Sequence, residues 1–368
     1  MFEKIARKTL ETIKPYIPGQ SIEDAEKEFG VTGLVKMASN ENPIGCSVAP
    51  EELSEAIQKA YYYPDLASAP LIGKLATKSG LSNNQIVLGN GSDELILMVV
   101  QAFLNPGEEV VTSEVTFSEY AFSTKIADGH LITVPMKNEA YDLDAIAAAI
   151  TLQTRVVYIA NPNNPTGTYV NQSDLETFLK RIPPHVIVVS DEAYVEYATA
   201  SDFPNTVPLM AHHKNLLILR TFSKIYGLAG FRIGYGFGHE SLISCLNKVR
   251  LPFNINSLAL KAAEIAIDNQ DHLKRSRLVN SEGMALLTTE LQALGLRVVP
   301  SQANFLCIHL DIKAAVVCES LIKKGFIVRS LQSFGWDQSI RVTIGLPEQN
   351  IGFVAALKSV LREGESHE

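Results

Sequence analysis

"RVVYIANPNNPTGTYVNQSDLETFLKRIPPHVIVVSDEAY", residues 155–194, contains a strand, a helix and a second strand in succession. The runs "RVVYIA" and "HVIVV" are short and apolar, whereas "QSDLETFLKRI" has the apolar spacing of a half-buried helix. Apolar strands that alternate with helices are typical of a parallel sheet covered by helices on both faces. This stretch therefore predicts an α/β fold.

The same alternation extends along the chain from residue 84 to about residue 270. Further predicted strands are "EEVVTS", "HLITVPM" and "NLLILRTF", and further predicted helices are "SDELILMVVQAFL" and "LDAIAAAIT". Beyond that point a long charged helix and several shorter elements predict a smaller α+β unit. We predict a large domain over residues 45–270, a small domain over 271–368, and an N-terminal segment, 1–44, that joins the small domain.

Composition excludes several classes of function. The chain has 368 residues, 46% of them apolar, and a net charge of -8, so it can bury a large core but offers no basic face for nucleic acid. Its N-terminus has no continuous apolar core, and no H-E-x-x-H motif is present. The four cysteines contain no C-x-x-C pair, which fits a reduced compartment. We expect a cytoplasmic protein that binds no metal, nucleic acid or membrane.

Polar clusters follow three of the predicted strands. "NPNNPTG" follows "VVYIA", "DEAY" follows "VIVVS", and "TFSK" follows "LLILR". Open α/β sheets bind ligands outside the carboxyl ends of their strands, so these clusters could share one site. Taken singly, the first is an ordinary turn, Lys224 is a surface charge, and Asp191 is a loop acid unless it faces a cation.

"GNGSDE", residues 89–94, precedes a helical run and allows two interpretations. Glycines and exposed amides at a helix N-terminus can hold a phosphate, but the same residues also form an ordinary capped helix start. The sequence matches neither the P-loop nor the G-x-G-x-x-G motif. "GYGFG", residues 234–238, is interpreted as a strand that needs small residues.

In this order, "NPNNPTG", "SDEAY" and "TFSKIYGLAGFR" resemble the aspartate-aminotransferase-like family of pyridoxal-phosphate enzymes over essentially the whole chain. The resemblance implies that Lys224 forms the Schiff base with the cofactor aldehyde and later carries a proton. Asp191 would bind the pyridine nitrogen, and Tyr194 and Asn164 would bind the phenolic oxygen. Phe117 would stack on the ring.

The resemblance also implies how the cofactor phosphate is bound. The residues assigned to it are Gly91, Ser92, Asp93, Thr221, Ser223 and Arg232. Tyr63, within "YYYPDL", would reach the phosphate of a neighbouring subunit, which implies a homodimer. The family usually has proline where this chain has Val115, so the loop before Phe117 departs from the family pattern.

The segments "IKPYIPGQSIEDAEKEFG", "KMASNENPIG" and "SIRVTIGLPEQN" resemble the histidinol-phosphate aminotransferases within this family. The resemblance implies transfer of an amino group between L-histidinol phosphate and 2-oxoglutarate in histidine biosynthesis, with Tyr16, Asn42, Arg329 and Arg341 facing the substrate. Arg341 would grip either the substrate phosphate or the α-carboxylate of glutamate. Arg329 would otherwise be a surface charge at the end of a strand.

Two other activities on the same scaffold stay open, an aromatic amino-acid aminotransferase and a decarboxylase of a phosphorylated amino acid. A regulator that uses this fold to sense a ligand is disfavoured, because no basic helix-turn-helix precedes residue 36.

Overall fold

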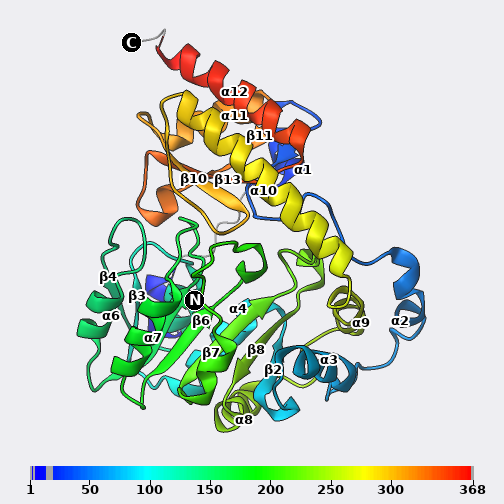
Figure 1. Ribbon diagram of the computed structural model, residues 1–368, viewed down its shortest axis with the longest axis vertical. Helices are drawn as coiled ribbons and strands as arrows, with labels where there is room; N and C mark the ends of the chain where they lie inside the picture. The colour runs from blue at the N-terminus through cyan, green and yellow to red at the C-terminus, as the bar shows by residue number, and fades with distance from the viewer. Residues whose placement is uncertain (1, 3–4, 14–19, 366–368) are drawn as a thin grey trace.

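Two sheets organise the chain, a seven-stranded sheet and a smaller four-stranded sheet beside it (Figure 1). The computed structural model describes residues 2, 5–13 and 20–365. We call the part packed around the first sheet the large-sheet unit and the part packed around the second the small-sheet unit. Their hydrophobic cores are separate clusters of buried side chains.

The seven-stranded sheet is mostly parallel, as the sequence predicts. Its strands in spatial order are β2 (Ile86–Gly89), β8 (Gly234–Gly238), β7 (Leu216–Thr221), β6 (Ile187–Asp191), β5 (Thr154–Ala160), β3 (Glu109–Ser113) and β4 (His130–Val134). β8 runs antiparallel to both of its neighbours, whereas β7, β6, β5, β3 and β4 are parallel. "GYGFG" is the strand β8, as interpreted from the sequence.

Helices flank this sheet and alternate with its strands along the chain (Figure 1). They are α2 (Ser54–Gln58), α3 (Ala69–Ser79), α4 (Gly91–Phe103), α5 (Glu119–Ile126), α6 (Leu143–Ala149), α7 (Gln172–Arg181), α8 (Glu240–Val249) and α9 (Ser257–Ala266). α7 shows why the local sequence forms a helix. The Asn171 side chain accepts a hydrogen bond from the amide of Asp174, a cap that contributes about 1 kcal/mol, and Leu175, Phe178 and Leu179 are buried.

The small-sheet unit is an α+β layer built from both ends of the chain, as expected. Its antiparallel sheet has the order β12 (Arg329–Ser330), β13 (Ser339–Thr343), β10 (Phe305–His309) and β9 (Arg297–Val298). The helices α10 (Gln270–Ala293), α11 (Ala314–Lys323) and α12 (Pro347–Glu365) pack beside it. Figure 1 shows α10 running from the vicinity of α9 into this unit, so one helix connects the two units.

The N-terminal segment lies against the small-sheet unit. β1 (Val35–Lys36) pairs in parallel with β11 (Phe326–Ile327), and α1 (Ile22–Phe29) packs near α11. Met37 belongs to the core of the small-sheet unit. The domain boundaries that we place after residues 44 and 270 stay predictions.

Short 3-10 helices occupy several connections. They are η2 (Lys8–Thr12), η3 (Pro50–Leu53), η4 (Asn83–Gln85), η5 (Val195–Tyr197), η6 (Val207–Ala211), η7 (Ala229–Phe231) and η8 (Gln332–Phe334). Within the described ranges, no helix combines the length and apolar character that crossing a bilayer requires.

Candidate active site

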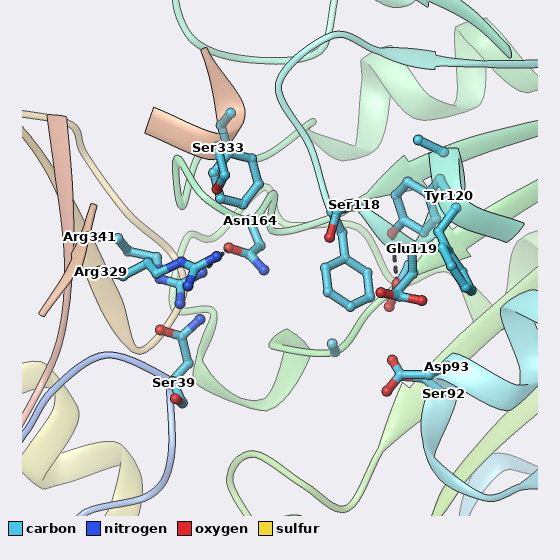
Figure 2. A pocket seen from close by; sticks show the side chains of 18 of the residues that line it. Ser39, Ser92, Asp93, Ser118, Glu119, Tyr120, Asn164, Arg329, Ser333 and Arg341 are labelled. Carbon is cyan, nitrogen blue, oxygen red and sulfur yellow. Dashed lines mark hydrogen bonds between the residues drawn. The ribbon is translucent and has the colours of Figure 1, made fainter. Parts of the chain in front are cut away.

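A cavity of about 780 Å³ lies between the two units, at the carboxyl ends of β5, β6 and β7. Residues from all three strand ends line it, together with the first turn of α4 and residues of the small sheet. Figure 2 shows Arg329 and Arg341 at one end of this cavity and Ser92 and Asp93 at the other, with Asn164 between them. Two ends that each suit an anion therefore face one another across a single space.

Lys224 lies in a turn shortly after β7, and its ammonium group lines the cavity. Nζ donates to the carbonyl oxygen of Ser39 at 3.4 Å and lies 5.6 Å from the centre of the Tyr194 ring. Both contacts are long, so these two neighbours hold the amine in the cavity only weakly.

Asp191 is the last residue of β6 and is 4% exposed. Its Oδ2 accepts a hydrogen bond from the Tyr120 hydroxyl at 2.7 Å, whereas Oδ1 has no well-formed hydrogen bond within residues 20–365. Burial raises the pKa of Asp191 to about 6, and the Tyr120 hydrogen bond limits this rise. The backbone amide of Ala193 also lowers this pKa, but because Oδ1 has no well-formed hydrogen bond it can still accept one from a ligand group that brings a proton or a positive charge.

The end of the cavity beside Ser92 and Asp93 combines a helix N-terminus with a guanidinium group. α4 begins at Gly91, so the amides of its first turn point towards this end with the positive end of the helix dipole. Arg232 Nη2 is 3.0 Å from Asp93 Oδ2, and Nη1 donates to Ser223 Oγ at 3.4 Å. Gly91 has a φ of +78°, and a Cβ there would lie 2.6 Å from Arg232 Nη2, so only glycine allows this approach.

The middle of the cavity holds flat and polar groups. Phe117 meets Tyr120 edge to face, with 5.8 Å between ring centres. Tyr194 is buried, and its hydroxyl accepts a hydrogen bond from Asn40 Nδ2 at 2.9 Å. Asn164 Oδ1 accepts a hydrogen bond from Arg341 Nη1, which connects the strand ends of the large sheet to the small sheet.

Two arginines form the other end of the cavity. Arg329 on β12 and Arg341 on β13 are directly opposite one another across the antiparallel pair, so their side chains share one face of the small sheet. Arg341 is 7% exposed, donates to the carbonyl oxygen of Ala38 at 2.6 Å and lies over the Phe305 ring. Two positive charges on directly opposite residues of neighbouring strands repel each other, and an anion bound between them would offset this repulsion.

Most of the side chains that the sequence singles out line this cavity. They are Ser92, Asp93, Phe117, Asn164, Asp191, Tyr194, Thr221, Ser223, Lys224, Arg232, Arg329 and Arg341. Gly91 lies beside Arg232 at its edge.

Asn42 and Tyr63 are not among the cavity-lining residues. Asn42 is buried behind the turn that carries Lys224, where its amide donates to Ile225 and Ser276. Tyr63 is 82% exposed and stacks on Phe253 with ring centres 4.7 Å apart. Tyr16 lies outside the described residues. The roles assigned to these three residues stay predictions.

Sequence reasoning missed several groups that shape the cavity. Tyr120 donates to Asp191, Asn40 donates to Tyr194, and Glu119 lines the wall at the start of α5. Burial raises the pKa of Glu119, and nearby Asp93 adds to the effect. Tyr120 stands three residues after Phe117, but no local pattern reveals a partner 71 positions along the chain.

Within the described part of the chain, no three histidine, cysteine or acidic side chains lie close enough together to hold a metal ion.

Known proteins that are similar to this chain cover nearly all of it. The model of the class I and class II aminotransferases matches residues 32–356. A histidinol-phosphate aminotransferase of Moorella thermoacetica is 46% identical over 357 residues, which are 96% of this chain and 92% of that protein. A similar protein of Geobacillus is 44% identical over 96% of this chain and 97% of its own length.

Solved structures agree with the sequence relatives. A histidinol-phosphate aminotransferase of Sinorhizobium meliloti in complex with pyridoxal-5'-phosphate has a TM-score of 0.88 at 27% identity, over 97% of both chains. A variant of the Thermus thermophilus aspartate aminotransferase has a TM-score of 0.80 at 23% identity, over 97% of this chain and 99% of that one, which shows a common fold. The similarity therefore extends over both sheets and the cavity between them.

Proposed function

The chain belongs to the class I and class II aminotransferases, and on this premise we propose that it transfers an amino group from L-histidinol phosphate to 2-oxoglutarate with pyridoxal phosphate as cofactor. The products are imidazole acetol phosphate and L-glutamate, and the reaction belongs to histidine biosynthesis. The observation that carries the substrate assignment is the pair Arg329 and Arg341 at the end of the cavity away from Ser92 and Asp93. A phosphorylated amine needs such an anion site in addition to the one for the cofactor phosphate.

The residues present in the cavity fit pyridoxal phosphate. Asp191 Oδ1 is a buried acceptor without a well-formed hydrogen bond in the described part of the chain, as a protonated pyridine nitrogen requires. Arg232 and the first turn of α4 would hold the phosphate, with Ser223 and Thr221 beside them. Asn164 and Tyr194 would bind the phenolic oxygen. When bound, this cofactor supplies an electron-poor ring that stabilises negative charge on the substrate carbon next to nitrogen.

Lys224 has two roles in the proposal. Its amine would hold the cofactor through the aldehyde, and as a free amine it would carry a proton to and from the substrate carbon next to nitrogen. The Nζ position supports this, because the amine is inside the cavity and its contacts to Ser39 and Tyr194 are weak enough to be exchanged.

The two substrates make different demands on the arginine pair. L-Histidinol phosphate carries a phosphate, whereas glutamate carries an α-carboxylate, and a planar guanidinium fork binds either anion through two parallel hydrogen bonds. Arg341 reaches the cavity beside Asn164, and Arg329 adds a second positive charge. Tyr16 would complete the substrate site.

A substrate panel tests the proposal. Purified holoenzyme is supplied with 2-oxoglutarate and with L-histidinol phosphate, phenylalanine or tyrosine as amino donor, and the glutamate formed is measured. We expect the highest kcat/KM with L-histidinol phosphate. Higher kcat/KM with the aromatic amino acids would favour the aromatic aminotransferase, and release of CO₂ from a phosphorylated amino acid without glutamate would favour the decarboxylase.

The lysine assignment has its own control. Lys224→Ala should lose both transamination and the yellow absorbance of the lysine-bound cofactor, because no other cavity residue is proposed to bind the aldehyde. An unchanged absorbance spectrum in this variant would refute the assignment.

We also propose that the active unit is a homodimer in the cytoplasm. A surface beside α2 exposes an apolar group made of Ile57, Tyr61, Tyr62, Tyr63, Leu66, Leu251 and Phe253. The Tyr63 ring stacks on Phe253, and the rings of Tyr61 and Tyr62 are tilted neighbours with centres 4.1 Å apart. Large contiguous apolar patches on a protein surface commonly mark an interface. Sedimentation equilibrium tests the dimer, and a monomer at all concentrations would contradict it.

A further inference from the structure

The turn that carries Lys224 is held from behind through one backbone carbonyl. The carbonyl oxygen of Ile225 accepts a hydrogen bond from Asn42 Nδ2 at 2.7 Å and lies 3.0 Å from His272 Nε2. The second N–H of the Asn42 amide donates to Ser276 Oγ at 2.8 Å. All three side chains are buried. We call Asn42, His272 and Ser276 the carbonyl clamp.

The chemistry of the acceptor fixes the proton on His272. A carbonyl oxygen only accepts, so Nε2 must carry the hydrogen that points at Ile225. Asn42 Nδ2 and His272 Nε2 lie 3.2 Å apart beside the same carbonyl oxygen. Burial lowers the pKa of His272, which keeps the ring neutral near neutral pH while it donates this hydrogen bond.

The clamp brings together segments that are far apart in sequence. Asn42 comes from the N-terminal segment, whereas His272 and Ser276 stand in the first turns of α10, the helix that continues into the small-sheet unit. Residues 45–47, which directly follow the N-terminal segment, also pack against the turn. A Cβ on Gly227 would lie 2.0 Å from the carbonyl oxygen of Gly45, and Ser47 N donates to the Tyr226 carbonyl at 3.3 Å.

We infer that Asn42 and His272 are positioning residues for the catalytic lysine: by holding the Ile225 carbonyl they fix the backbone from which Lys224 reaches the substrate. Ile225 immediately follows Lys224, and Gly227 N donates to the Lys224 carbonyl at 2.9 Å, so the clamp and this hydrogen bond define the turn. The clamped carbonyl belongs to the peptide between Ile225 and Tyr226, and rotation of that peptide would shift the backbone that carries Lys224. The inference rests on the proposed function only in taking Lys224 as the amine that moves the proton.

Four variants separate positioning from simple stabilisation. Asn42→Ala and His272→Leu each remove one donor to the carbonyl, whereas His272→Gln keeps an N–H of similar reach. Asn280→Ala is the matched control, because Asn280 is also a buried α10 residue but donates to the Ala303 carbonyl, away from the lysine turn. For each variant we would measure the thermal midpoint, the rate at which the cofactor-free protein acquires the absorbance of lysine-bound cofactor, and kcat and KM for the amino donor.

If Asn42 and His272 position the lysine, the variants should change kcat and the rate of cofactor capture but not KM. Asn42→Ala and His272→Leu should lower kcat by about 10- to 100-fold, since misplacing a reacting group by about 1 Å has effects of this size. Both should also slow cofactor capture, while KM for the amino donor stays near the wild-type value. His272→Gln should recover most of kcat, and Asn280→Ala should lower the thermal midpoint with little change in kcat.

Other results would overturn the inference. One is a kcat in His272→Leu that falls no further than in Asn280→Ala, and another is a His272→Gln variant as slow as His272→Leu. If both donor-removing variants fail to fold, His272→Gln against Asn280→Ala still decides the question, because loss of kcat in the glutamine variant alone would contradict it. Wild-type protein that never acquires the absorbance would refute the proposed function instead.

Discussion

The two walls of the cavity are built in different ways. In the large-sheet wall, Asn164, Asp191 and Lys224 lie at or shortly after the carboxyl ends of three adjacent parallel strands, so the direction of the strands alone brings them to the same edge. In the small-sheet wall, Arg329 and Arg341 meet because two antiparallel strands pair in one particular register. The first arrangement tolerates small shifts along a strand, whereas a one-residue slip in the second would turn an arginine to the other face.

The walls also differ in how their charged groups are satisfied. Arg341 donates to the carbonyl oxygen of Ala38 and to Asn164, so its guanidinium is supported by the protein itself. Asp191 has the Tyr120 hydroxyl on one oxygen and no well-formed hydrogen bond from the described residues on the other, and burial raises its pKa. The Arg341 guanidinium of the small-sheet wall is therefore better supplied with protein hydrogen bonds than the Asp191 carboxylate of the large-sheet wall.

Asp191→Asn should have the largest effect, because it removes the charge of the buried carboxylate in the large-sheet wall. A neutral amide cannot stabilise a positive charge on the pyridine nitrogen, and we expect kcat to fall by about 10²- to 10³-fold, as when an electrostatic stabiliser is removed from other enzymes. Steady-state kinetics with L-histidinol phosphate and 2-oxoglutarate would measure the change. An unaltered kcat would contradict the role of Asp191.

The same variant makes a prediction for the stability of the cofactor-free protein. The pKa of Asp191 is raised from 3.8 to about 6, so the folded chain binds the carboxyl proton more tightly than the unfolded chain does. This proton binding stabilises the folded state fully below about pH 4, and the stabilisation is lost as the pH rises through about 6. Relative to Asp191→Asn, the wild type should lose up to about 3 kcal/mol of unfolding free energy between about pH 4 and about pH 7. Urea unfolding at both pH values measures this difference, and equal pH dependence in the two proteins would count against the raised pKa.

Arg341→Gln should have the next largest effect and should act on the other wall. Loss of a charge-assisted pair of hydrogen bonds should raise KM for L-histidinol phosphate by about 10- to 100-fold, with a much smaller change in cofactor affinity. Arg341→Lys, which keeps the charge but loses the planar fork, should fall between the variant and the wild type. If Arg341→Gln instead weakened cofactor binding and left KM unchanged, Arg341 would belong to the cofactor site and not to the substrate site.

Tyr120→Phe should have the smallest effect of the three, because it removes one supporting hydrogen bond from Asp191. The pKa of Asp191 should rise further, and kcat/KM near neutral pH should fall by about three- to tenfold, the value of one such bond. The matched control is Tyr158→Phe, since Tyr158 is equally buried and stacks on Tyr120 but donates to the Ile96 carbonyl. Equal losses in both variants would show that Tyr120 acts through packing.

The large-sheet wall could be anticipated from the sequence to a greater extent than the small-sheet wall. The apolar runs that end at Ala160 and Asp191 predict strands, and adjacent parallel strands must present the residues that follow them at one edge. Arg329 and Arg341 could be assigned only by resemblance, because β12 is two residues long and carries no periodic signal. Tyr120 and Asn40 escaped notice because their partners are distant in sequence.

By itself, the sequence determined the α/β class, the order of strands and helices along the chain, and the placement of polar residues after buried strands. These features depend on local periodicity and on the preference of apolar side chains for the interior. Only the tertiary structure decided that Asn42 and His272 meet behind the Lys224 turn and that Tyr120 supports Asp191. Such contacts depend on how the N-terminal segment, α10 and α5 pack on the large sheet, and no short stretch of sequence encodes that packing.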